Sequence, residues 1–175
     1  MKKVIFDTDI GIDDAMALLF LHHAPDVDLI AITTGFGNAS VSNTTRNALY
    51  MKELFNMSAA VYAGAATPVG SALGEGYADF VHGKNGLGDI PITTPMCEAE
   101  AMPAAEAIVE LVRANPHALS VVAVGRMTNL AMALALDPEL PSLVKELIVM
   151  GGVFGYNGHR GNVSPVAEAN IAGDP

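Results

Sequence analysis

The sequence predicts an α/β fold with a mainly parallel β-sheet flanked by helices. Short apolar runs alternate along the chain with helical patterns, which is the order of βαβ units. These runs are apolar throughout rather than alternating with polar residues, as expected for strands covered on both faces. With 175 residues, of which 51% are hydrophobic and 16% charged, the chain can bury a sizeable core. We therefore expect a single domain over residues 1–175.

Two predicted helices separate the first three predicted strands. Residues 4–6 (VIF) form a short buried strand, and residues 29–34 (LIAITT) form a strand rich in β-branched residues. Between them, Asp13 is the predicted cap of a helix over 13–23, which ends before Pro25. Apolar residues at helical spacing predict a second helix, and a weaker strand follows it, at residues 43–55 and 60–62.

The alternation continues after a long irregular stretch. Residues 64–103 are too long for an ordinary connection, which predicts a segment that is either functional or partly mobile. The elements that follow alternate between helix and strand, at residues 104–113, 119–124, 128–136 and 147–150. The last residues, 151–175, show no clear strand and stop at Gly-Asp-Pro, so we expect a fold that is truncated at its C-terminus.

Charge and cysteine content exclude several classes of function. Nine Lys and Arg against 19 Asp and Glu give a formal net charge of −10, whereas binding to nucleic acid needs a basic face. Asp7 interrupts the N-terminal apolar run, and no stretch reaches about 18 apolar residues, so we expect neither a signal peptide nor a membrane partner. The single cysteine, Cys97, rules out an internal disulfide and favours a cytoplasmic setting.

The sharpest chemical signal is a group of aspartates between the first strand and the first helix, at Asp7, Asp9, Asp13 and Asp14. Crowded carboxylates raise one another's pKa values, and a hard cation with oxygen ligands relieves the repulsion. One or two of them could serve only as helix caps, but four in this spacing predict a metal or catalytic site. Ligands of open parallel sheets bind at the carboxyl ends of strands, which here are glycine-rich and polar, at residues 34–38, 125–129 and 150–152.

Six segments occur in a recognisable order: DTDIGIDDA (7–15), AITTGFGN (31–38), HGKNGLG (82–88), GRMTNLA (125–131), MGG (150–152) and AEAN (167–170). Together they resemble the inosine–uridine-preferring nucleoside hydrolases. The resemblance implies that family's α/β sandwich and one bound Ca²⁺. It also implies hydrolysis of the N-glycosidic bond of purine and pyrimidine ribonucleosides to free base and ribose, and a homo-oligomer, either a dimer or a tetramer.

The resemblance further implies roles for individual residues. Asp9 would be the general base and, together with Asp14 and the carbonyl oxygen of Val124, a calcium ligand. The other implied site residues are Asp13, Asn38, Asn162, Glu168 and Asn170 on the ribose hydroxyls, Met150 beneath the sugar, His82 beside the base, and Asp7 behind the calcium ligands. Because His82 stands among glycines, we expect its side chain to be exposed.

Departures from the family pattern leave two alternatives open. Ala169 stands where the family usually has an aromatic residue, and no residue matches the further calcium-ligating aspartate or the histidine of the family's C-terminal half. One alternative is therefore a truncated domain that binds calcium without turnover. The other is a haloacid-dehalogenase-like phosphatase with Mg²⁺, with Asp7 as nucleophile and Asp9 as acid–base, although Ile10 and Gly11 do not fit its usual loop.

Overall fold

Strand β1 lies at the centre of a five-stranded sheet. The computed structural model describes residues 1–70, 76–152 and 168–175. Every strand pair is parallel, and the order across the sheet is β3-β2-β1-β4-β5. The strands are β1 (Lys2–Thr8), β2 (Val27–Thr34), β3 (Ala60–Ala63), β4 (Leu119–Ala123) and β5 (Glu146–Val149). The predicted fold class is confirmed.

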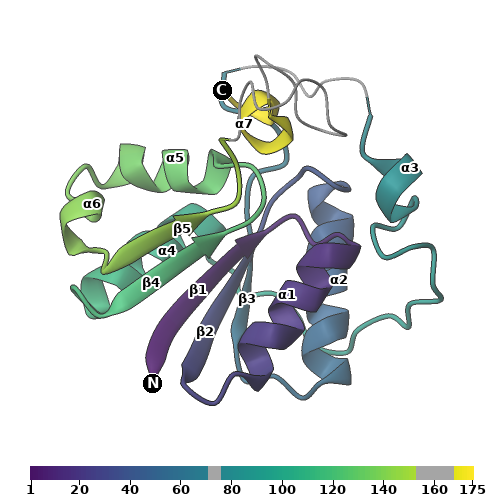
Figure 1. The fold of residues 1–175 in the computed structure, drawn as a ribbon, viewed down its shortest axis with the longest axis horizontal. Coiled ribbons are helices and arrows are strands. Elements are labelled where there is room, and N and C mark those ends of the chain that lie inside the picture. Colours follow the sequence, from purple (N-terminus) through teal and green to yellow (C-terminus); the bar gives the residue numbers. More distant parts are fainter. Residues whose placement is uncertain (71–75, 153–167) are drawn as a thin grey trace.

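Helices cover both faces of this sheet (Figure 1). One face carries α1 (Ile12–His23) and α2 (Val41–Leu54), and the other carries α4 (Ala104–Ala114), α5 (Thr128–Leu136) and α6 (Leu140–Leu143). The short helices α3 (Asp79–His82) and α7 (Ala169–Gly173), like α6, were not predicted. Across the described ranges, no helix is both long and apolar enough to cross a bilayer.

The core has two parts, one on each side of the sheet. Ile5 and Phe6 are adjacent on β1, so their side chains point to opposite faces, and both are fully buried. Phe6 packs with Leu18 of α1 and the apolar side of α2, whereas Ile5 packs with Ile108 of α4. β1 is therefore covered on both faces, as its apolar sequence predicts.

β5 departs from the expectation that every strand is covered on both faces. Leu147 and Ile148 are each 51% exposed, although they are adjacent and point to opposite faces. An apolar hollow of about 700 Å³ lies beside β5, with Ile108, Leu130 and Leu140 among its lining residues. Within the described residues β5 pairs with β4 alone, so its outer edge is open.

Candidate active site

The strand order places the acidic loop at a topological switch point. From β1 the chain proceeds to β2 and β3 on one side, and β4 and β5 lie on the other side. Open α/β sheets bind ligands in the crevice at such a point, beyond the carboxyl ends of the strands. The segments that meet there are the β1–α1 loop with Asp9, the β2–α2 loop with Asn38, and the β4–α5 loop with Val124.

Asn38 joins the two central carboxylates. Its backbone N–H donates to Asp9 Oδ2 at 2.8 Å, and its side-chain Nδ2 donates to Asp9 Oδ1 at 3.2 Å. The same Nδ2 donates to Asp14 Oδ2 at 2.8 Å, and that oxygen also accepts from the Gly11 backbone N–H at 2.7 Å. The structure thus brings together three of the predicted site residues, Asp9 and Asn38 from two loops and Asp14 from the first turn of α1.

The Asp9 and Asp14 side chains are almost completely buried, each residue being 3% exposed. Burial raises the pKa of Asp9, and the negative charge of Asp14 raises it further. Burial also raises the pKa of Asp14, against the hydrogen bond from Gly11, which lowers it. A buried pair of carboxylates of this kind favours a partner that carries positive charge.

Two glycines allow neighbouring backbone to approach Asp9. A Cβ atom at Gly37 would overlap the Asp9 carboxylate, and one at Gly125 would lie 3.1 Å from Asp9 Oδ1 and 3.0 Å from its backbone nitrogen. Gly125 follows Val124, whose N–H donates to the Asp7 carbonyl at 2.9 Å. The loops after β2 and β4 therefore both close on Asp9.

Asp7 is buried at the end of β1, two residues before Asp9. Its Oδ1 accepts hydrogen bonds from Thr33 Oγ1 at 2.6 Å and Asn129 Nδ2 at 2.9 Å. Burial raises the pKa of Asp7 to about 6, although both hydrogen bonds lower it. At 1% exposure the carboxylate is inaccessible to a substrate, which argues against a phosphatase with Asp7 as nucleophile. Sequence reasoning missed Asn129, whose signal was its place in the GRMTNLA segment.

His82 and Asp13 lie beside the acidic loop. His82 is 8% exposed, so the expected exposure is wrong, and its Nδ1 accepts from the Ile12 backbone N–H at 3.2 Å. The Asp13 side chain is 71% exposed, and its Oδ1 lies 3.8 Å from His82 Nδ1. The predicted helix cap at Asp13 is also wrong, because α1 begins at Ile12 with Gly11 as N-cap and Asp14 accepts the Gly11 N–H.

Asn170 connects α7 to the residues that follow β4 and β5. Its Nδ2 donates to the Val124 carbonyl at 2.9 Å and to the Met150 carbonyl at 3.1 Å. Glu168 is buried and caps α7, because its carboxylate accepts from the first backbone N–H groups of that helix at 3.1 Å. Asn170 therefore links Met150 to Val124, and Glu168 lies beside Asn170 at the start of α7, while Asn162 lies outside the described residues.

Carboxylate and carbonyl oxygens are the groups here that could hold a metal ion. In the described part of the chain, no three His, Cys, Asp or Glu side chains form such a group. Asp9 and Asp14 nevertheless both accept from Asn38 Nδ2, so lone pairs of the two carboxylates converge on one point. Ca²⁺ takes about 6–8 oxygen ligands from carboxylates, backbone carbonyls and water. The two carboxylates and the Val124 carbonyl are donors of the type that calcium prefers.

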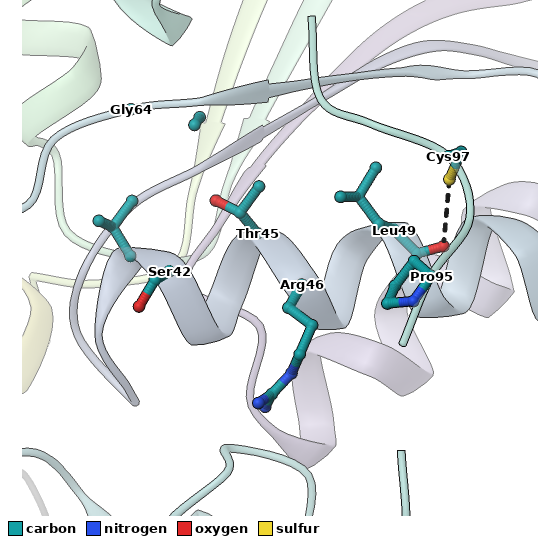
Figure 2. Close-up of a pocket in the computed structure, with 9 residues that line it drawn as sticks. Ser42, Thr45, Arg46, Leu49, Gly64, Pro95 and Cys97 are labelled. Atoms are coloured by element: carbon teal, nitrogen blue, oxygen red, sulfur yellow. Dashed lines mark hydrogen bonds between the residues drawn. The ribbon is translucent and has the colours of Figure 1, made fainter. Parts of the chain in front are cut away.

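A separate hollow lies along α2 and is formed by other residues (Figure 2). It encloses about 340 Å³, and Thr45, Gly64 and Cys97 are among its lining residues. Figure 2 shows Arg46 extending away from Gly64 and Cys97, and its Nη2 donates to the Asn85 carbonyl at 3.1 Å. None of the residues that line this hollow belongs to the predicted site.

Comparison with known proteins decides the family. The family model described as inosine-uridine preferring nucleoside hydrolase matches residues 4–175. The chain belongs to this family. Uridine nucleosidase 1 of Arabidopsis thaliana is 42% identical over 175 residues, which cover 99% of this chain. The non-specific ribonucleoside hydrolase RihC of Salmonella newport is 41% identical over 172 residues, which cover 98% of it.

Solved nucleoside hydrolases also share the fold. The plant nucleoside hydrolase PpNRh1 superposes with a TM-score of 0.92 at 41% identity, and the purine-preferring ribonucleoside hydrolase from Gardnerella vaginalis with 0.92 at 33%. Each comparison covers 99% of this chain but 54% and 55% of the other. The chain likewise spans 51% of the Arabidopsis protein and 54% of the Salmonella protein, so it corresponds to about half of these nucleoside hydrolases.

Proposed function

We propose that this chain supplies the catalytic carboxylate of a calcium-dependent nucleoside hydrolase, which cleaves purine and pyrimidine ribonucleosides to free base and ribose. The observation that carries the proposal is the buried pair Asp9 and Asp14, joined by Asn38 at the switch point of a chain from this family. Relatives named for uridine and for ribonucleosides in general support a nucleoside as the substrate class.

Asp9, Asp14 and the Val124 carbonyl would hold the calcium ion. The chemistry of these groups supports this assignment. All three offer oxygen atoms as metal ligands, and the two carboxylates are buried and repel each other. A calcium ion bound there would supply positive charge that lowers the pKa of an adjacent water molecule. Because Asn38 Nδ2 donates to the same carboxylates, we expect this amide to turn towards the ribose when the ion is bound.

Asp9 would act as the general base. Its carboxylate accepts a proton from the attacking water, whose oxygen forms a bond to C1′ of the ribose. The bond from C1′ to the base nitrogen breaks, and the base leaves with the electron pair and takes up a proton. The sugar carries positive charge in this oxocarbenium-like transition state, which nearby carboxylates stabilise.

The remaining residues would orient the nucleoside. Side chains with oxygen or amide groups hold the ribose hydroxyls, namely Asp13, Asn38, Asn162, Glu168 and Asn170. Met150 packs beneath the sugar, and His82 lies beside the base. Fixing the sugar ring in this way lowers the entropy that the reaction must lose at the transition state.

Ribose release from inosine and from uridine tests the proposal, measured with calcium and then with a chelator. We expect chelator-sensitive release that Asp9→Asn lowers by about 10²- to 10⁴-fold, while Asp26→Asn, which changes an exposed carboxylate, leaves it unchanged. No release from folded, calcium-loaded protein would overturn the activity of these 175 residues and favour a domain that binds calcium without turnover. Light scattering on the same sample tests the expected dimer or tetramer.

A further inference from the structure

We propose that Asn129 is a positioning residue, which holds the loops of Asp9 and Asn38 at the distance their hydrogen bonds require. Asn129 is the second residue of α5 and is 2% exposed. It has no role in the proposed reaction, and its hydrogen bonds within the described residues go to Asp7, Thr34 and Ala65. Its side chain instead lies where the carboxyl ends of β1, β2 and β3 meet.

The carboxamide of Asn129 bonds to all three of these strand ends. Its Nδ2 donates to Asp7 Oδ1 at 2.9 Å and to the Thr34 carbonyl at 3.0 Å. Its Oδ1 accepts from the Ala65 backbone N–H, just beyond β3, at 2.9 Å. Both N–H groups of the amide are thereby used, together with one acceptor position on the oxygen. A Cβ atom at Gly64 would overlap Asn129 Oδ1, so glycine is required for this approach.

Two of these bonds lie at the start of the loops that form the acidic site. Asp7 precedes Asp9 by two residues, and Thr34 precedes Asn38 by four. The Asn38 backbone N–H then donates to Asp9 at 2.8 Å. The connections therefore form a closed circuit: Asn129 holds the start of both loops, and the hydrogen bond from Asn38 to Asp9 joins the loops further along. A shift of either strand end relative to Asn129 changes the separation of Asp9 and Asn38.

Only an amide satisfies all the partners of this position. A carboxylate would place acceptor oxygen against Asp7 Oδ1 and the Thr34 carbonyl, both of which are acceptors themselves. An apolar side chain would remove both the acceptor for the Ala65 N–H and the donor to the Thr34 carbonyl, and unpaired polar groups in a folded protein are costly. The positioning of the two loops by Asn129 does not depend on the proposed function. Only the statement that these loops carry catalytic residues rests on it.

The experiment measures the position of the loops without substrate or calcium. Amide hydrogen exchange of Asn38, read by NMR well below the unfolding temperature, reports the bond from its N–H to Asp9. We expect Asn129→Asp to raise the exchange rate of Asn38 by about tenfold, as expected when a hydrogen bond of about 1.4 kcal/mol is lost, while amides of α4 keep their rates. The reciprocal double variant, Asp7→Asn with Asn129→Asp, restores a donor facing an acceptor between these two side chains but not at the Thr34 carbonyl, and should recover part of the protection.

Asn115→Asp is the matched control. Asn115 donates from Nδ2 to the Leu111 carbonyl at 2.9 Å and accepts from Lys3 Nζ at 2.5 Å, so its hydrogen bonds lie outside the acidic loop. This variant makes the same amide-to-carboxylate change and removes the donor to Leu111 but keeps the acceptor for Lys3, and it should leave exchange at Asn38 unchanged. If Asn129→Asp lowers the unfolding temperature but leaves Asn38 exchange equal to that of Asn115→Asp, the role of Asn129 is structural alone and the proposal is overturned.

Asn129→Ser provides a second test if the carboxylate prevents folding, because serine leaves room for a water molecule. Faster exchange at Asn38 in this variant supports the proposal, and unchanged exchange overturns it. If neither variant folds, Asn129 is required for folding itself and the positioning proposal is likewise overturned. If the wild type releases no ribose but the Asn129 variants change the amide exchange rate of Asn38, only the proposed function is overturned. The exchange measurement does not depend on turnover.

Discussion

Replacing Asp7 by asparagine should remove a pH dependence from the stability of the protein. Burial favours the protonated form of Asp7, so folding raises its pKa from 3.8 to about 6. Between these values the folded state binds more protons than the unfolded state, and the free energy of unfolding therefore falls as the pH rises. Because one pKa unit corresponds to about 1.4 kcal/mol, the total loss is on the order of 3 kcal/mol. About 2 kcal/mol of this falls between about pH 4.5 and about pH 7.5, since the unfolded carboxyl is already mostly ionised at the lower pH.

Urea unfolding at these two pH values, in the presence of a chelator, measures the effect. Asp7→Asn keeps an oxygen that can accept from Thr33 and Asn129, so the variant is expected to fold. Between the two pH values, the free energy of unfolding of the variant should fall by about 2 kcal/mol less than that of the wild type. Asp26→Asn should behave like the wild type. A pH dependence in Asp7→Asn equal to that of the wild type would refute the argument that burial raises the pKa of Asp7.

Three further outcomes are expected. From the proposed calcium site we expect calcium to raise the unfolding temperature of the wild type, as read by calorimetry, and Asp14→Asn to abolish this rise; an equal rise in both would exclude Asp14 as a ligand. Gly37→Ala should lower the free energy of unfolding by about 1–3 kcal/mol, because its Cβ would overlap the Asp9 carboxylate. Gly35→Ala should lower it less, since the nearest atom to its Cβ would be Asn129 Nδ2 at 3.5 Å. Equal losses in urea unfolding would contradict this. Ile148→Lys on the open edge of β5 should change stability by less than about 0.5 kcal/mol. If the proposed oligomer forms through this edge, the variant should also reduce association in light scattering, and unchanged association would place the contact elsewhere.

The order of the main elements could be predicted because each strand and long helix carries its own local pattern. The predicted helix at residues 128–136 matches α5 at both ends. The one-turn helices α3, α6 and α7 could not be predicted, since a helix of four or five residues shows no period. The exposure of Leu147 and Ile148 was also unexpected, because an apolar sequence shows what a strand is suited to contact and not what covers it.

The meeting of Asp9, Asp14 and Asn38 could be predicted because the carboxyl ends of parallel strands lie at one edge of a sheet. The burial of His82 and the contacts of Asn129 could not. The partner of His82 is 70 residues away in the chain, and Asp7 is 122 residues from Asn129. Such contacts depend on the tertiary arrangement, for which local spacing gives no signal.

The central position of β1 also has a consequence for the order of folding. Its neighbour β2 follows after a single helix, whereas its other neighbour, β4, begins only at Leu119. Closing so long a segment costs chain entropy that is recovered only when the strands pair, so we expect this pairing to form late. A nascent chain that stops before β4 contains α1, α2 and every aspartate of the acidic loop, yet Asp7 lacks its Asn129 donor and Asp9 lacks the backbone of Gly125 beside it. The aspartates of the acidic loop, although made before β4, are therefore among the last residues to reach their final environment.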